Sequence, residues 1–412
     1  MAPVKALTSI VGLQGVGTAL SFAVVLSLTS ILGAEGFGRY VWVLSIGSTL
    51  ALFAEMGFPT TIIKRFAPLN MASVRGPSPI SNSLSLYAIG TLATIIVALS
   101  LWSKTIITDR PEIIWALPVA GGLACLVLSA AVLRAAGMAI RSNTIQFIIR
   151  PILVLLGVWL IGAYGAIDPR LYLLVYTAAT LGSALIFVMP LIQNSVGNWR
   201  GGGLISPVGA HFQVSIARSV SNHLPILITG FFVAPELLAY LAISIRLTSP
   251  IRFGLAAARS YYSPSINASI KNRDLVAAGQ HYRYATLFSF SAALLVMVAL
   301  IAVTIVLLGL QNGPLSGFDN TRLLLWVMIL SAFSHLSIAI FGPVQIVAIL
   351  LHEERYVRNI NFFAIILFAV ALIGAAWIGD LVLLTVVMIL YSVGVSASLG
   401  VRVRSAFRKA AN

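Results

Sequence analysis

The sequence has few charged residues and a single cysteine. Charged side chains make up 9% of its 412 residues, whereas soluble proteins carry about 25%. Hydrophobic residues make up 59% of the chain. Cys125 lies inside an apolar run, so a disulfide framework is excluded. The five histidines are scattered and form no metal-ligand spacing with that cysteine. These absences, with the long apolar runs, predict an all-α polytopic membrane protein.

The sequence also lacks the motifs of common catalytic sites. It has no Walker loop, so we do not expect ATP to drive the protein directly. It has no carboxylate pair at glycosidase spacing, and its serines and histidines are scattered through apolar segments. We therefore expect a protein that is not an enzyme and that needs no cofactor or metal. The net charge of +15 could suggest nucleic acid, but basic loops on the cytoplasmic side of a membrane explain it better.

Twelve apolar segments are long enough to cross a bilayer, which takes about 20 residues in a helix. They are residues 7–32, 40–63, 83–103, 112–133, 145–164, 170–192, 208–233, 237–258, 283–309, 322–350, 359–378 and 381–401.

The basic residues are distributed unevenly between the loops that join these segments. With the N-terminus placed in the cytoplasm, 18 of the 26 basic residues fall in inner loops and tails and 5 in outer loops. Most acidic residues fall outside. This bias predicts that both termini are cytoplasmic. The outer loops are short, so no extracellular domain is expected.

The chain divides into two halves of six segments each. Shifted by 200 residues, the short break at 34–38 falls on the break Ala234-Pro235-Glu236, and a segment led by a tyrosine follows each. We expect a bundle at 1–195, a cytoplasmic linker at 196–207 and a second bundle at 208–412. Because each half has an even number of spans, the halves would be parallel repeats around a central cleft, as in some transporters.

The most informative stretch is 207–258, where each of two consecutive spans contains an arginine. Arg218 and Arg246 would lie about 16 Å and about 15 Å from opposite membrane faces, at 1.5 Å per residue. An arginine at the bilayer centre costs roughly 2.5 kcal/mol or more unless it faces a polar cavity. Two at one depth predict a cavity that receives negative charge. The alternative is that these polar side chains form hydrogen bonds between helices and bind no ligand.

Other polar residues inside the spans are candidates for lining that cavity: Gln14, Asn222, Arg252 and His335. A packed polar role is the commoner one for a single histidine within a span. Glu55 is the only acidic residue inside a span. It is either a structural partner of Arg218 or Arg246, or a site for a coupling proton or cation.

Two groups of residues resemble a known family. Leu32-Gly33-Ala34-Glu35-Gly36-Phe37-Gly38-Arg39-Tyr40, followed by Ala54-Glu55-Met56-Gly57-Phe58-Pro59-Thr60, is similar to the start of Wzx-type oligosaccharide flippases of the MOP superfamily. Ser263-Pro264-Ser265-Ile266-Asn267, with Asn272-Arg273-Asp274 and Tyr282, resembles the loop after their eighth span. Leu238 departs from the glycine that is common at its place in the second repeat.

This resemblance implies a function and partners. The substrate would be a glycan linked to undecaprenyl diphosphate, flipped from the inner to the outer leaflet of a bacterial cytoplasmic membrane for surface polysaccharide assembly. Arg218 and Arg246 would pair with the diphosphate, since the guanidinium fork suits phosphate. Glu55 would couple transport to protons or sodium. Membrane lipids and the polysaccharide polymerase machinery would be partners.

Two other functions remain open. A multidrug and toxin exporter of the same superfamily moves cations, so acidic residues should outnumber arginines in its cleft, and here they do not. A membrane glycan polymerase typically carries its site on a large outer loop, which this sequence lacks.

Overall fold

Every regular element that the structure describes is a helix. The computed structural model describes residues 2–55, 59, 111–135, 138–195, 209–309, 315 and 318–411; it leaves out the side chains of residues 2–11, 14, 111, 135, 139, 187–195, 209–220, 260 and 408–411. Water is absent from the bilayer core, so backbone N–H and C=O groups there must bond within the protein, and helices achieve this within one segment. The expected all-α membrane fold is confirmed.

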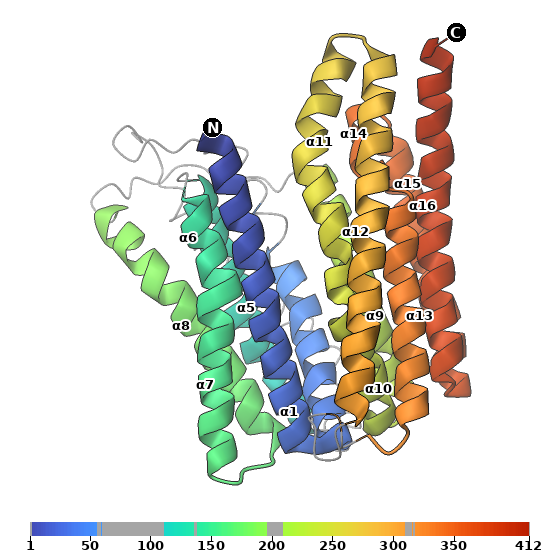
Figure 1. The fold of residues 1–412 in the computed structure, drawn as a ribbon. Coiled ribbons are helices and arrows are strands. Elements are labelled where there is room, and N and C mark those ends of the chain that lie inside the picture. Colours follow the sequence, from blue (N-terminus) through green and yellow to red (C-terminus); the bar gives the residue numbers. More distant parts are fainter. Residues whose placement is uncertain are drawn as a thin grey trace. The chain divides into compact units, whose positions relative to one another are not determined.

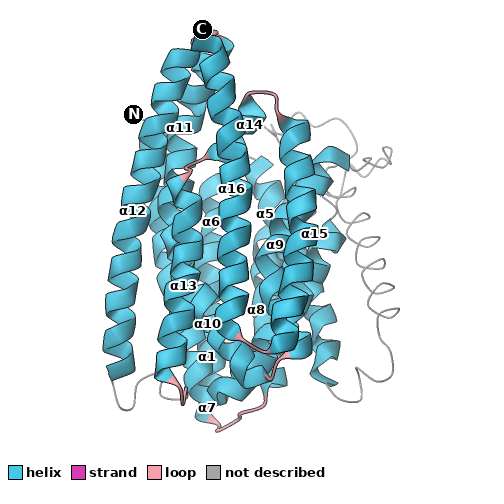
Figure 2. Cartoon of the chain, turned by 90° about the vertical axis from the view of Figure 1, so that its right-hand side faces the viewer, coloured by secondary structure: helices cyan, strands magenta, loops and turns pink. Residues whose placement is uncertain are grey.

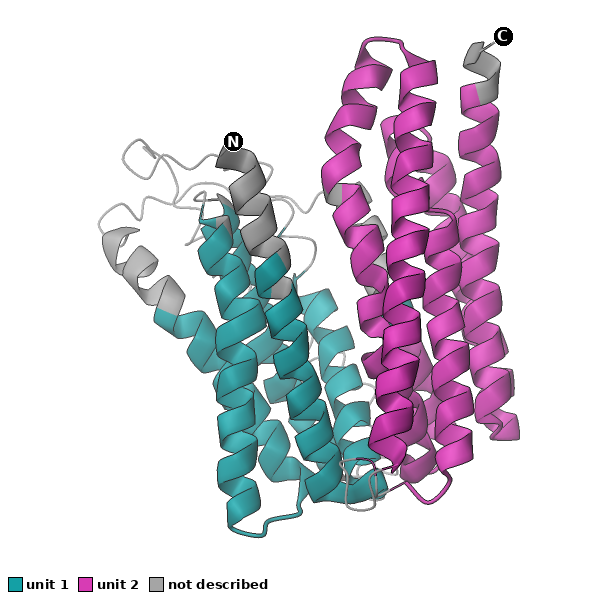
Figure 3. Cartoon of the chain, in the orientation of Figure 1, with its two compact units in different colours: residues 1–223 teal, residues 224–412 magenta. Residues whose placement is uncertain are grey.

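The chain forms two compact units, residues 1–223 and 224–412, coloured separately in Figure 3. The helices of the first unit are α1 (Ala2–Glu55), the 3-10 helix η1 (Pro111–Trp115), α5 (Ala116–Ala135), α6 (Ala139–Thr144), the π-helix η2 (Ile145–Ile149), α7 (Arg150–Ala163) and α8 (Pro169–Ser195). Helix α9 (Gly209–Phe232) contains the boundary between the units. Within the first unit, α1 packs against α5 and α7, and α8 packs against α5 and α7 (Figure 1).

The second unit contains α10 (Pro235–Thr248), the 3-10 helix η4 (Ser249–Arg252), α11 (Phe253–Lys271), α12 (Leu275–Gly309), α13 (Thr321–Ile340), α14 (Val344–Leu350), α15 (Glu354–Ile378) and α16 (Leu381–Ala411). Helices α11 and α12 pack together, and α13 packs against α10, α12 and α16. Figure 2 shows α13 and α16 side by side, with α15 beyond them.

Among the described residues, nine helical segments are long and apolar enough to cross a membrane. Every predicted span except the third has a counterpart in the described helices. The first two both fall in α1, on either side of Gly33, and α1 covers the second as far as Glu55. The predicted third span, 83–103, lies outside the described residues, and so does the predicted linker at 196–207. The domain boundaries at 195 and 208 therefore stay predictions.

Close backbone contacts hold the first unit together. A Cβ atom added to Gly47 would lie 2.6 Å from Cγ1 of Val119 and 2.9 Å from the carbonyl oxygen of Ala116. Only glycine therefore lets α1 approach α5 this closely. Outward-facing side chains such as Trp159 and Leu160 are exposed, as expected for surfaces that meet lipid rather than water.

The predicted outer break at 34–38 is shorter than expected. Residues 34–38 are helical, and the only non-helical backbone inside α1 is at Gly33, with φ 65° and ψ −177°. This conformation is essentially restricted to glycine. The break is therefore a kink at one residue rather than a loop. The second predicted break, at 234–236, is confirmed: α9 ends at Phe232 and α10 begins at Pro235.

We expect Gly33→Ala to destabilise the protein by roughly 1–3 kcal/mol, because alanine cannot adopt the Gly33 backbone without strain. Open space surrounds the added methyl group, so a clash is not the cause. Gly182→Ala is the matched control, since Gly182 also has open space but lies within regular helix α8. Gly182→Ala should stabilise the folded protein by about 0.5–1 kcal/mol. Thermal unfolding of the purified protein measures both, and equal effects would contradict the role of Gly33.

Candidate functional site

A break in the helix that carries Arg246 forms the first part of the site. Helix α10 ends at Thr248, and η4 separates it from α11 inside one continuous candidate span, Pro235–Lys271. Pro250 accounts for the break, because proline has no N–H to continue the α-helical bonding. The carbonyl of Arg246 accepts from the backbone N–H of Ser249 and also from its hydroxyl, the latter at 2.8 Å. Arg246 and Arg252 lie on either side of this break, and both are half-buried.

His335 of α13 packs against this broken helix. The histidine hydrogen-bonds the backbone of Ile245, and Arg252 lies within electrostatic range of the imidazole. The structure therefore brings two predicted cavity residues, Arg252 and His335, together. The sequence pattern gave both as polar residues within spans but did not pair them.

Two buried polar atoms on this face of α13 have no hydrogen-bond partner: Nε2 of His335 and Oγ of Ser331. The two residues are four apart, so they lie one turn apart on the same face. Leaving such atoms unsatisfied costs about 1–3 kcal/mol each. Ser334, by contrast, hydrogen-bonds Ser392 of α16 at 3.0 Å. The face that carries His335 and Ser331 is thus suited to bind a further polar group.

The first unit contains a second charged group, formed by Glu55 at the end of α1 and Arg134 near the end of α5. These side chains interact electrostatically, although they are not within ion-pair distance. Arg134 also donates from Nε to the carbonyl of Ala130 at 3.2 Å. The sequence prediction assigned Arg134 to an inner loop and missed this pairing. The signal was available, because Glu55 lies toward the inner end of the second predicted span and Arg134 directly follows the inner end of the fourth.

Several predicted site residues are not tested by the structure. The side chains of Gln14 and Arg218 lie outside the described part of the chain. Asn222 is exposed within its unit. Arg218 and Arg246 belong to different units, so their common cavity stays a prediction.

The charged residues of the first family-like motif have a structural role. Arg39 binds Glu35, with 2.6 Å between nitrogen and oxygen. It also lies 3.9 Å from Glu112, a buried carboxylate in η1. These contacts tie α1 to the start of the segment that leads into α5. In the second motif, the Asp274 carboxylate accepts from the backbone N–H of Ala277 at 2.9 Å, and Tyr282 donates to the carbonyl of Phe341 at 2.8 Å.

No protein-family model and no curated protein sequence matches the chain. Solved transporter structures do match. The lipid II flippase MurJ in an inward closed conformation has a TM-score of 0.67 and 14% identity, covering 96% of this chain and 89% of that one. The chain has the fold of MOP superfamily transporters. A MOP superfamily transporter from Pyrococcus furiosus matches with a TM-score of 0.62 and 12% identity, over 100% and 97% of the two chains.

A multidrug resistance MATE family transporter in an inward-facing conformation also has this MOP fold. Its TM-score is 0.60 and its identity 13%, over 98% of both chains. The neighbours thus include both a lipid II flippase and multidrug resistance transporters. The likeness establishes the fold, and the choice between these functions rests on the residues of this chain.

We expect Glu55 and Arg134 to stabilise each other by roughly 0.2–1 kcal/mol, the usual range for ion pairs with an exposed partner, because Arg134 is exposed and Glu55 is half-buried. A double-mutant cycle with Glu55→Gln and Arg134→Gln, followed by thermal unfolding, measures this coupling. Arg141→Gln is the matched control, because Arg141 is a nearby exposed arginine on α6. Additive effects of the Glu55 and Arg134 changes would show that the pair does not interact.

Proposed function

We propose that the protein flips a polyprenyl-diphosphate-linked oligosaccharide across the cytoplasmic membrane by alternating access. The observation that carries this proposal is the sign of the charge within the described spans. In the second unit, Arg246 and Arg252 lie well inside a candidate span, and Arg252 lies within electrostatic range of His335. The acidic residues of that unit lie at helix ends and in loops. A site of this character favours an anionic substrate.

The physical chemistry of the helix break supports this proposal. A guanidinium binds two phosphate oxygens at once, and such charge-assisted bonds are roughly twice as strong as neutral ones. Broken helices in transporters commonly form the substrate site, because their freed backbone groups and polar side chains face the transported molecule. Arg246 at the break, with Arg218, would hold the diphosphate. Asn222, Gln14, Arg252 and His335 would line the path of the sugars.

The alternative is export of cationic drugs. Some of the structural neighbours are multidrug resistance transporters of the MATE family. A cation site needs carboxylates away from the membrane surface. Glu55 is the one acidic residue available for that purpose in the described spans, and it lies beside Arg134. We therefore assign Glu55 to coupling with a proton or sodium ion. On this proposal Glu55→Gln abolishes the ion dependence of transport while the protein still accumulates.

The proposed direction of transport requires both termini to be cytoplasmic. Asp168, Lys271, Asp319 and Arg355 are all exposed, so only the membrane should decide their access to a reagent. In a variant that lacks Cys125, cysteines at Asp168 or Asp319 should react with an impermeant thiol reagent applied to intact cells. Cysteines at Lys271 or Arg355 should react only after the cells are opened. The reverse pattern would contradict the orientation.

The function itself is tested by changing Arg246. We expect Arg246→Ala to lower the transport rate about ten- to a hundredfold, because hydrogen bonds to charged groups contribute roughly 1.5–3 kcal/mol. Arg246→Lys should retain part of the activity, since it keeps the charge but loses the two-pronged geometry. The assay follows a fluorescent polyprenyl-diphosphate oligosaccharide as it reaches the far leaflet of reconstituted vesicles, per molecule of inserted protein.

Arg322→Ala is the matched control, because Arg322 is an exposed arginine at the start of α13 in the same unit. It should leave transport unchanged. Export of a cationic dye from the same vesicles tests the alternative. Dye export without movement of the lipid-linked oligosaccharide would overturn the flippase proposal. So would full flipping per molecule in Arg246→Ala.

A further inference from the structure

An apolar groove runs along the surface between α15 and α16, and its volume is about 370 Å³. The stacked rings of Phe368 and Tyr391, with centroids 4.2 Å apart, pack across the two helices. Gly394 is exposed, and a Cβ atom added there would meet nothing within 4 Å. The groove is lined by Ile360, Phe363, Ala364, Leu367, Phe368, Ala371, Val387, Leu390, Tyr391, Gly394, Val395 and Ser398.

The length of this groove matches one acyl chain. Along α16 its lining extends from Val387 to Ser398, which is about 16 Å at 1.5 Å per residue. The hydrocarbon core of a bilayer is about 30 Å thick, so the groove covers about half of it. Phospholipid chains occupy one leaflet and reach about that depth. A polyprenyl chain is far longer and would leave most of its length outside the groove.

One end of the groove leads to a charged pair. Arg402 lies four residues beyond Ser398, and Tyr356 lies four residues before Ile360, so both continue the lined faces of their helices. The Arg402 guanidinium lies 2.9 Å from the Glu353 carboxylate and 5.5 Å from the centre of the Tyr356 ring. Arg402 is 48% exposed and Glu353 is 25% exposed. Both charges are therefore accessible to a ligand at this end of the groove.

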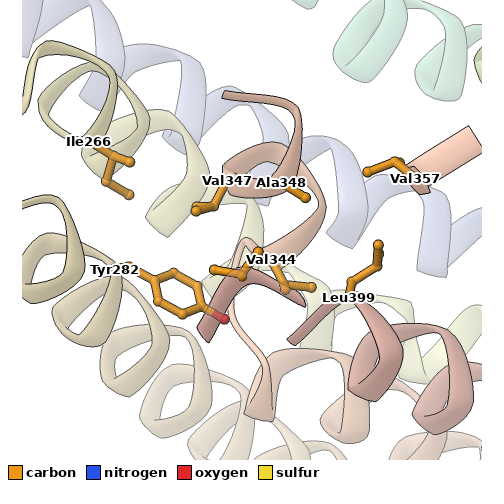
Figure 4. Close-up of a cluster of buried hydrophobic side chains, with 8 residues drawn as sticks. Ile266, Tyr282, Val344, Val347, Ala348, Val357 and Leu399 are labelled. Atoms are coloured by element: carbon orange, nitrogen blue, oxygen red, sulfur yellow. The ribbon is translucent and has the colours of Figure 1, made fainter. Parts of the chain in front are cut away.

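A buried apolar cluster holds this end of the two helices in place. Val357 of α15 and Leu399 of α16 pack with α14 (Figure 4), and Val403 of α16 belongs to the same cluster. Each of these three side chains is 1% exposed. The charged pair and the groove therefore lie on a fixed pair of helices, which limits the entropy lost when a ligand is ordered there.

We propose that this groove binds one phospholipid whose headgroup carries both a phosphate and an ammonium group. One acyl chain lies in the groove over Gly394. The phosphate binds Arg402, and the ammonium binds Glu353. The charge of the pair decides this choice, because Glu353 neutralises Arg402 and would repel the several negative charges of a diphosphate. A headgroup with one charge of each sign satisfies both side chains.

The experiment uses native mass spectrometry of the full-length protein in mild detergent. It is titrated with a phosphatidylethanolamine, with a phosphatidylglycerol of the same acyl chains, and with a polyprenyl diphosphate. We expect one phosphatidylethanolamine bound about fivefold more tightly than phosphatidylglycerol, which is the effect of about one exposed ion pair. Glu353→Gln should remove this preference. Equal binding of the two phospholipids, or tighter binding of the polyprenyl diphosphate, would overturn the proposal.

Groove-filling variants test the place of binding. Gly394→Phe should abolish retention of the phospholipid, because its ring occupies the groove. Gly374→Phe is the matched control, since Gly374 is also exposed, has open space and lies outside the groove lining. If Gly394→Phe does not fold, Ala371→Phe fills the facing wall on α15. Retention in a folded groove-filling variant equal to that of the Gly374 control would contradict the proposal.

Discussion

The absence of water from the bilayer core is the constraint on which this structure depends. A backbone that cannot bond to water must bond to itself, and so the described chain is helical almost wherever it is apolar. The same constraint gives meaning to each departure from regular helix. The kink at Gly33 is confined to one residue, and beside the break at η4 the carbonyl of Arg246 is bonded by Ser249.

Polar side chains in the spans follow the same rule, and the exceptions mark the candidate site. Most hydroxyls in the helices bond to a carbonyl one turn back, as Thr248 does with Ser244 at 2.7 Å. Ser331 and His335 each retain an atom without a partner. They lie on α13, which packs against both α10 and η4, and His335 is within electrostatic range of Arg252. A buried polar atom without a partner is costly. The unpaired atom of His335 lies beside a broken helix and an arginine. Together these three features indicate a binding face more strongly than any one of them alone.

The fold alone does not choose between substrates. Structures of a lipid II flippase, of a multidrug transporter and of an archaeal transporter resemble this chain over almost all of its length at 12–14% identity. The distinction between an anionic and a cationic substrate therefore depends on which charges the spans contain. Here the charged residues deep within α10 and η4 are Arg246 and Arg252, whereas the described acidic residues of their unit lie at helix ends and in loops. The one acidic residue in α1 away from its kink, Glu55, lies beside Arg134.

The sequence by itself determined the helical class, the places of the described spans and the break at 234–236. The length of an apolar segment and the position of a proline determine these features locally, without contacts from distant parts of the chain. It overestimated the break after Leu32, because a single glycine can bend a helix without a loop. Only the tertiary structure paired Arg134 with Glu55, and Arg252 with His335, since these contacts join helices far apart in the chain. The groove over Gly394 was equally invisible, because hydrophobicity shows which faces are apolar but not how two helices leave a space between them.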